Sequence, residues 1–299
     1  MKKILLVLLL SIVVSFMGCD TLVENSTASM VRIQPVPIKI DSLIVHLSLF
    51  YICDHEVTQK EWVEIFEKNP SFFDNSGNKT IAGYYVYDTN ITEGEIQENR
   101  PVENVNWYMA IAYCNKRSIK EGLDVCYSVK VSGNEIDWEK LTLADVPTSK
   151  SSDWDAVTCD WDTNGYRLPT CAEWEYAARG GIVHNSDIWA GTITQDKVAD
   201  YAWYNVNSIN KTHEVKKKRA NGYGLYDMSG NVDEMCWDWS TANYPSGEFN
   251  PHGDATGTAR FIRGGSCIQD VSYQKVGIMP EIEPSYESLT TGFRVCRSF

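Results

Sequence analysis

The thiols are the side chains of this 299-residue sequence that could do the widest range of chemistry, since it contains nine cysteines. Cys19 lies near the N-terminus, and the other eight are scattered as Cys53, Cys114, Cys126, Cys159, Cys171, Cys236, Cys267 and Cys296. Such wide scatter is not typical of a small disulfide-stapled scaffold. Two interpretations remain open. Either Cys126 and Cys159 form a bridge that closes an insert between two strands, or all eight are buried free thiols in a core that needs no staples.

The first residues have the layout of a secretory leader. Lys2 and Lys3 precede an apolar run over residues 4–16, which is too short to span a bilayer. The stretch Ser15-Phe16-Met17-Gly18-Cys19 resembles a bacterial lipobox, in which the cysteine is lipidated and becomes the new N-terminus. An ordinary signal peptide with an incidental cysteine is the alternative.

We therefore expect a signal peptide over residues 1–18 and a lipidated Cys19 with a polar tether over residues 19–35. The lipid makes a membrane one of the partners, because more than one acyl chain gives stable anchoring. The expected location is the bacterial cell envelope, with the protein lipid-anchored at the outer surface.

Charge argues against one class of partner. The chain has 40 acidic and 27 basic residues, and loss of Lys2 and Lys3 with the leader leaves 25 basic against 40 acidic, a net charge of −15. Nucleic-acid binding is driven by a basic face, so no nucleic-acid partner is expected. The run Lys216-Lys217-Lys218-Arg219 is interpreted as solvated chain. Ten tryptophans and sixteen tyrosines argue against disorder.

Local patterns predict the elements that would position these residues. Thr58 is placed as an N-cap with Glu61 three residues on, which predicts a helix to Phe66. Two further helices are predicted over residues 106–121 and 170–179. Apolar alternation predicts strands over residues 37–51, and Asn, Asp, Gly and Ser content predicts loops over residues 69–100 and 128–165. Short strands joined by loops are expected after Gly181.

Five ordered motifs are more specific. They are Glu56-Val57-Thr58, Gly165 to Thr170 running into Glu173 to Gly181, Gly224 to Val232, Arg263-Gly264-Gly265-Ser266 and Gly292-Phe293-Arg294. Together they resemble the formylglycine-generating enzyme family, also called the sulfatase-modifying factor family. The resemblance covers residues 36–299.

The resemblance implies an α+β fold, a variant of the C-type lectin fold. It has two main helices, small twisted antiparallel sheets, much irregular loop and bound calcium. Gly264 and Gly265 would supply positions where chain approaches chain closely. Arg167, Arg179 and Arg294 are expected to pair with core carboxylates.

The catalytic members use two cysteines after the Arg-Gly-Gly-Ser motif to bind copper through sulfur. Alignment on that motif puts Gln269 and Gln274 at the two positions, and an amide is neither a thiolate ligand nor a redox centre. Cys267 lies two residues from Gln269 and is a weak substitute. Another branch holds iron with histidines, but the five histidines here have no clustered spacing. We therefore expect no copper and no catalytic residue.

Calcium, as a structural ion, is what the resemblance favours. The family's second calcium loop maps onto Asp227, Gly230, Val232 and Glu234, where two side chains and two backbone carbonyls would make an oxygen cage. The alternative is that Asp227 and Glu234 cap turns or pair with arginines. The other calcium loop maps onto Asp200, Tyr201, Asn207 and Ile209. Asp233 and Met235 depart from the family pattern, which usually has two tryptophans there.

The C-terminal segment, about residues 237–299, resembles the variable proteins of diversity-generating retroelements. In those proteins adenine-specific copying errors diversify a terminal repeat, and a lectin-like fold displays the result as a binding surface, as an antibody does. The ligand-binding residues expected here are Cys267, Ile268, Asp270, Val271, Tyr273, Ile282, Tyr286, Glu287, Ser288, Leu289 and Thr290. The alternative is that these are core and loop residues of a decayed enzyme.

Three hypotheses about function follow. The first is a surface-displayed, calcium-stabilised lipoprotein, expected to be a monomer, that binds an extracellular protein or glycan without catalysis. The second is a metal-dependent oxidoreductase of the formylglycine-generating type. The third is a structural envelope protein that uses the fold only as a module.

Overall fold

The computed structural model describes residues 30–40, 43–83, 85–181, 187–241 and 247–299. The expected signal peptide, Cys19 and most of the expected tether lie outside these residues. Part of the stretch predicted as tether is a strand, because β1 (Met30–Ile33) pairs with β4 (Phe50–Cys53). None of the described helices has the length and apolar character needed to cross a membrane.

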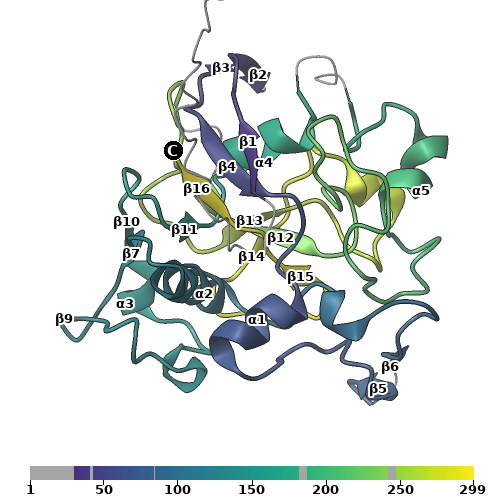
Figure 1. Cartoon of the computed structure of the whole chain (residues 1–299), viewed down its shortest axis with the longest axis horizontal. Helices are drawn as coiled ribbons and strands as arrows, with labels where there is room; N and C mark the ends of the chain where they lie inside the picture. Colours follow the sequence, from purple (N-terminus) through teal and green to yellow (C-terminus); the bar gives the residue numbers. More distant parts are fainter. Residues whose placement is uncertain (1–29, 41–42, 84, 182–186, 242–246) are drawn as a thin grey trace, which may run out of the picture.

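One sheet joins the two ends of the chain. Its strand order is β1-β4-β16-β11, with β16 at Cys296–Ser298 and β11 at Tyr166–Arg167. Every pair is antiparallel, and Ile52 of β4 lies between Val31 and Cys296. Strands β1 and β16, which are far apart in the sequence, therefore pair with the same strand, β4. This sheet lies beside α4 in Figure 1.

A second sheet lies at the centre of the molecule (Figure 1). Its order is β14 (Glu281–Ile282), β13 (Arg260–Arg263), β12 (Asp233–Trp239) and β15 (Thr291–Gly292). The β12–β15 pair is parallel, although the resemblance implied antiparallel sheets. The chain reaches β15 from β14 through an irregular segment rather than a tight hairpin, which permits this direction.

The remaining strands of the described residues form four two-stranded sheets. The predicted strands of residues 37–51 are β2 (Ile38–Ile40), β3 (Leu43–Val45) and β4, and β2 pairs with β3. The predicted loop regions contain three other pairs, β5 (Asn78–Ile81) with β6 (Tyr85–Asp88), β7 (Tyr127–Ser128) with β10 (Thr158–Cys159), and β8 (Lys130–Val131) with β9 (Asn134–Glu135).

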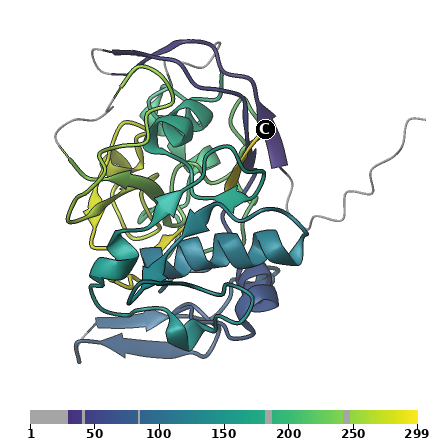
Figure 2. The same ribbon diagram turned by 90° about the vertical axis from the view of Figure 1, so that its left-hand side faces the viewer.

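The three predicted helices are confirmed as α1 (Gln59–Phe66), α2 (Trp107–Lys120) and α4 (Cys171–Ala178). Thr58, Asn106 and Thr170 cap them, and Thr58 and Thr170 form capping boxes with Glu61 and Glu173. Figure 2 shows α2 lengthwise, with the β5–β6 hairpin below it. Short helices α3 (Ser152–Asp155) and α5 (Val198–Tyr201) and 3-10 turns η1 (Gln97–Asn99), η2 (Leu143–Asp145), η4 (Gln195–Lys197) and η5 (Val271–Gln274) lie in connections.

Aromatic packing and buried ion pairs hold these elements together. Trp62 of α1 stacks on Tyr113 of α2 with ring centroids 5.6 Å apart. The expected arginine pairs are present as Arg167 with Glu173, Arg179 with Glu175 and Arg294 with Glu234. All eight described cysteines are free thiols, so the Cys126–Cys159 bridge is not formed. Seven of them are buried, as the other interpretation expected, but Cys159 is only partly buried.

Candidate functional site

The Arg-Gly-Gly-Ser turn leads from β13 into the segment where the catalytic family has its cysteines. Gly264 and Gly265 have left-handed φ angles of 93° and 75°. A Cβ on Gly265 would lie 2.7 Å from the Tyr273 carbonyl oxygen and 2.8 Å from Gln274 Oε1. The turn therefore packs directly against η5, as the close approach expected of these glycines requires.

The two glutamines bind opposite sides of one residue. The Ser266 N–H donates to Gln269 Oε1 at 2.9 Å, and Gln274 Nε2 donates to the Ser266 carbonyl at 3.1 Å. Gln274 is fully buried. The positions that would carry a dithiol thus hold amides that fix the turn through hydrogen bonds, and neither offers sulfur to copper.

Cys267 does not replace the missing thiols. Its side chain is fully buried, and its N–H donates to the Asn231 carbonyl. Burial, with Glu103 and Asp233 nearby, raises the pKa of the Cys267 thiol well above its ordinary value. A neutral thiol is a poor nucleophile, and Cys267 belongs to no group of three metal-ligating side chains among the described residues.

The expected ligand-binding residues separate by exposure. Asp270, Tyr273 and Tyr286 are exposed, whereas Ile268, Val271, Glu287, Ser288 and Leu289 are partly buried. Cys267, Ile282 and Thr290 are buried, which corrects the expectation that they face a ligand. Their interior placement follows from the sheet: Ile282 belongs to β14, and the Thr290 carbonyl accepts from the Asp233 N–H of β12.

The exposed residues belong to two stretches, 268–273 and 284–288, which different parts of the chain hold in place. Residues 268–273 are held by the Trp189 ring N–H, which donates to the Val271 carbonyl, and by the Asn205 N–H, which donates to the Gln269 carbonyl. The segment 284–288 is held by backbone N–H groups around the start of α2, since Trp107 donates to the Pro284 carbonyl. Hydrogen bonds from distant parts of the chain therefore position both stretches.

Asp233 and Met235, the two departures from the family pattern, are both buried. Met235 packs in the core beneath α2. Desolvation raises the pKa of Asp233 to about 7, although the Ser266 side chain and the Gly265 N–H favour its charged form. A buried acid thus lies directly behind the turn that carries Ser266.

The residues expected to form the second calcium loop, Asp227 and Glu234, lie near a third carboxyl group, that of Glu56, and near Arg294. Asp227 Oδ2 accepts from the Lys216 N–H, but its buried Oδ1 has no partner. Glu234 receives two hydrogen bonds from Arg294 at 2.6 Å. Desolvation raises the pKa of Asp227 to about 6. Desolvation, and then the neighbouring carboxyl groups, raise the pKa of buried Glu56 well above its ordinary value. Glu234 is thus paired with an arginine, and the unpaired Asp227 oxygen is of the type that a calcium ion takes as a ligand.

The residues expected to form the other calcium loop lie nearer the surface. Asp200 and Ile209 are exposed and Tyr201 is partly buried. Both ends of the Asn207 amide are used by backbone, because Oδ1 accepts from the Tyr204 N–H and Nδ2 donates to the Ala202 carbonyl.

Comparison with known proteins identifies the family. The model of the sulfatase-modifying factor enzyme 1-like domain matches residues 24–299. The chain belongs to the sulfatase-modifying factor family. It is 34% identical over 320 residues to chaperone protein LppX of Paenibacillus barcinonensis, over the full length of both chains. It is 31% identical over 266 residues to the formylglycine-generating enzyme of Mus musculus, covering 82% of this chain and 65% of that enzyme.

A solved structure has the same fold. Treponema denticola variable protein 1 superposes with a TM-score of 0.81 at 42% identity, covering 90% of this chain and 94% of that chain. The expected α+β fold, the C-type lectin fold of the formylglycine-generating type, is therefore confirmed, as is the resemblance to variable proteins. Proteins with this fold carry different names and roles, so function depends on the residues of the site.

Proposed function

We propose that this protein is a non-catalytic lipoprotein of the bacterial cell envelope that binds an external protein or glycan. The observation that carries the proposal is the pair Gln269 and Gln274. Each amide is hydrogen-bonded to Ser266 at a position where copper-dependent members of the family need a thiol. Similarity to a variable protein and to a chaperone, both named for roles other than oxidation, supports this choice.

The binding surface in this proposal is the exposed part of residues 268–289, with Tyr273 and Tyr286 as its anchors. Their side chains are 50% and 61% exposed. Tyrosine supplies large contact area and a hydroxyl at a low cost in side-chain entropy. The proposed partner is an extracellular protein or glycan, bound by a monomer, with no nucleic acid involved.

The binding test uses the full chain on arrays of glycans and extracellular proteins. The Tyr273→Ala, Tyr286→Ala double variant should lose affinity at least about tenfold for every ligand that the native protein captures. Tyr85→Ala is the matched control, because Tyr85 is 58% exposed but lies on the β5–β6 hairpin. Equal binding by the double variant would contradict the proposed surface.

The proposed location depends on lipidation of Cys19. Cys19→Ser should move the protein from the membrane fraction to the soluble fraction, because no acyl chain would be attached. Protease treatment of intact cells then reports whether the native protein faces outward. Retention of the serine variant in the membrane would argue against the anchor.

Calcium binding is proposed at Asp227 and Glu234, with the carbonyls of Gly230 and Val232. Removal by a chelator should lower the thermal midpoint by about 5–10 °C if calcium is near 100 times its dissociation constant, and added calcium should restore it. Asp227→Asn should abolish this response, whereas Asp200→Asn should keep it. A chelator effect that survives Asp227→Asn would place the ion elsewhere. The Asp200, Tyr201, Asn207 and Ile209 set stays a sequence prediction.

The enzymatic alternative is tested with copper and a peptide carrying the sulfatase motif. We expect no oxidation of its cysteine by the native chain. Turnover that Cys267→Ala abolishes would overturn the non-catalytic assignment.

A further inference from the structure

Three consecutive residues at the end of β4 turn their side chains toward one point. One donor atom each of Cys53, Asp54 and His55 lies within 4.8 Å of the other two, and all three residues are buried. Residues in a continuous strand alternate between faces, but the chain bends at Asp54 and His55. Within the described ranges, no other three His, Cys, Asp or Glu side chains come together in this way.

The donors converge on one nitrogen. Cys53 Sγ lies 3.6 Å from His55 Nδ1, and Asp54 Oδ1 contacts the same atom. The other Asp54 oxygen, Oδ2, is bound by Lys216 Nζ at 2.7 Å. The Cys53 sulfur and an Asp54 oxygen thus both approach His55 Nδ1, where a proton would lie between them. A metal ion could take the place of that proton.

We propose that Cys53, Asp54 and His55 bind a divalent zinc-type metal ion. Thiolate, imidazole and carboxylate together are a donor set that zinc prefers. Tetrahedral zinc with ordinary bond lengths separates sulfur and nitrogen ligands by about 3.5 Å, close to the observed Cys53–His55 distance. In this proposal the Asp54 carboxylate moves away from His55 Nδ1 to admit the ion.

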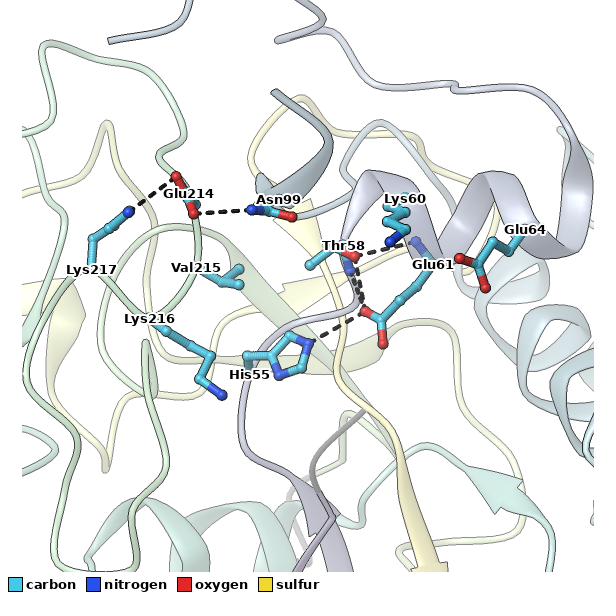
Figure 3. A pocket seen from close by; sticks show the side chains of 10 residues that line it. All are labelled: His55, Thr58, Lys60, Glu61, Glu64, Asn99, Glu214, Val215, Lys216 and Lys217. Atoms are coloured by element: carbon cyan, nitrogen blue, oxygen red, sulfur yellow. Dashed lines mark hydrogen bonds and ion pairs between the residues drawn. The ribbon is translucent and has the colours of Figure 1, made fainter. Parts of the chain in front are cut away.

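A neighbouring carboxylate can orient His55 as a zinc ligand. His55 Nε2 lies 3.5 Å from Glu61 Oε2, and Glu61 is itself fixed by the Thr58 N–H and hydroxyl (Figure 3). A carboxylate behind the free nitrogen orients a metal-bound histidine. His55 also lines a pocket of about 350 Å³ (Figure 3). Water is the fourth ligand in this proposal.

This site is separate in chemistry from the calcium loop, although Lys216 touches both. The Lys216 N–H binds Asp227 Oδ2, whereas its Nζ binds Asp54 Oδ2. Calcium takes oxygen ligands only, while the Cys53 site offers sulfur and nitrogen. The experiment is therefore done in saturating calcium, and Asp227→Asn should leave it unchanged.

Cobalt(II) is the probe, because it reports thiolate ligation by a charge-transfer band. The reduced, metal-free full chain is expected to bind one cobalt ion with that band, and zinc should displace it. Cys53→Ala should abolish the band, and His55→Gln and Asp54→Asn should each weaken binding at least tenfold. Glu61→Gln should weaken binding about 10–100-fold and keep the band. Cys114→Ala removes another buried thiol and should change nothing.

The outcomes decide the proposal even if one variant fails to fold. A native chain that gives no thiolate band overturns it. So does a band that survives both His55→Gln and Asp54→Asn, or one that Cys114→Ala abolishes. Failure of the tyrosine variants to affect ligand binding would contradict the proposed function without touching this result.

Discussion

At the scale of single residues, the exchange of thiols for amides changes what the Ser266 turn can do. A thiolate accepts weakly and holds soft metals, whereas an amide both donates and accepts strong hydrogen bonds. Gln269 uses its acceptor and Gln274 its donor on the two backbone groups of Ser266. The turn can therefore keep its shape without any metal.

Gly265 should tolerate no side chain, because its φ of 75° is left-handed and a Cβ would lie 2.7 Å from the Tyr273 carbonyl oxygen. Gly265→Ala is expected to lower the free energy of unfolding by about 2 kcal/mol or more, from conformational strain and the backbone clash. Gly277→Ala is the control, since a Cβ there meets nothing within 4 Å. Urea unfolding measures both, and equal midpoints would refute the packing argument.

At the scale of elements, side chains define where helices begin. The Thr58 hydroxyl accepts a hydrogen bond from the Glu61 N–H, and the Glu61 carboxylate accepts one from the Thr58 N–H. Such caps satisfy backbone donors that the first helical turn leaves open. The start of α1 in turn fixes Glu61 behind His55.

Thr58→Ala should therefore cost about 1 kcal/mol of stability, because it leaves the N-terminal donors of α1 unsatisfied. Lys60→Ala, at an exposed position of the same helix, should change stability by less than about 0.5 kcal/mol. Chemical denaturation of both variants gives the comparison. A larger effect at Lys60 would show that the cap does not control α1.

At the scale of the whole molecule, the fold buries several carboxyl groups, and their burial raises their pKa values. Desolvation raises the pKa of Asp227 to about 6, of Asp233 and Asp238 to about 7 and of Glu103 to about 8. The folded state holds these protons where the unfolded chain has released them. Their contribution to stability is therefore full below about pH 4 and is lost as the pH rises toward 8.

We expect the calcium-free protein to become less stable between pH 5 and pH 8. In Asp233→Asn this fall should be smaller by on the order of 2 kcal/mol, because the amide has no proton to lose. Asp196→Asn, at an exposed position, should follow the native protein. Urea titrations at fixed pH values measure the slopes, and an unchanged slope in Asp233→Asn would mean that its carboxyl is not buried as a neutral acid.

The amino-acid sequence alone determined the local features: the starts of α1, α2 and α4, the glycine turn at Gly265 and the family motifs. These signals act within a few residues, as a cap does between Thr58 and Glu61. Tertiary structure decided which side chains are buried, because burial depends on strands that are distant in the chain. Pairing of β12 with β13 and β15 buries Asp233 and brings Thr290 and Ile282 inside. The bend after Cys53 likewise became visible only in three dimensions, since three adjacent side chains share one point there against the alternation of a strand.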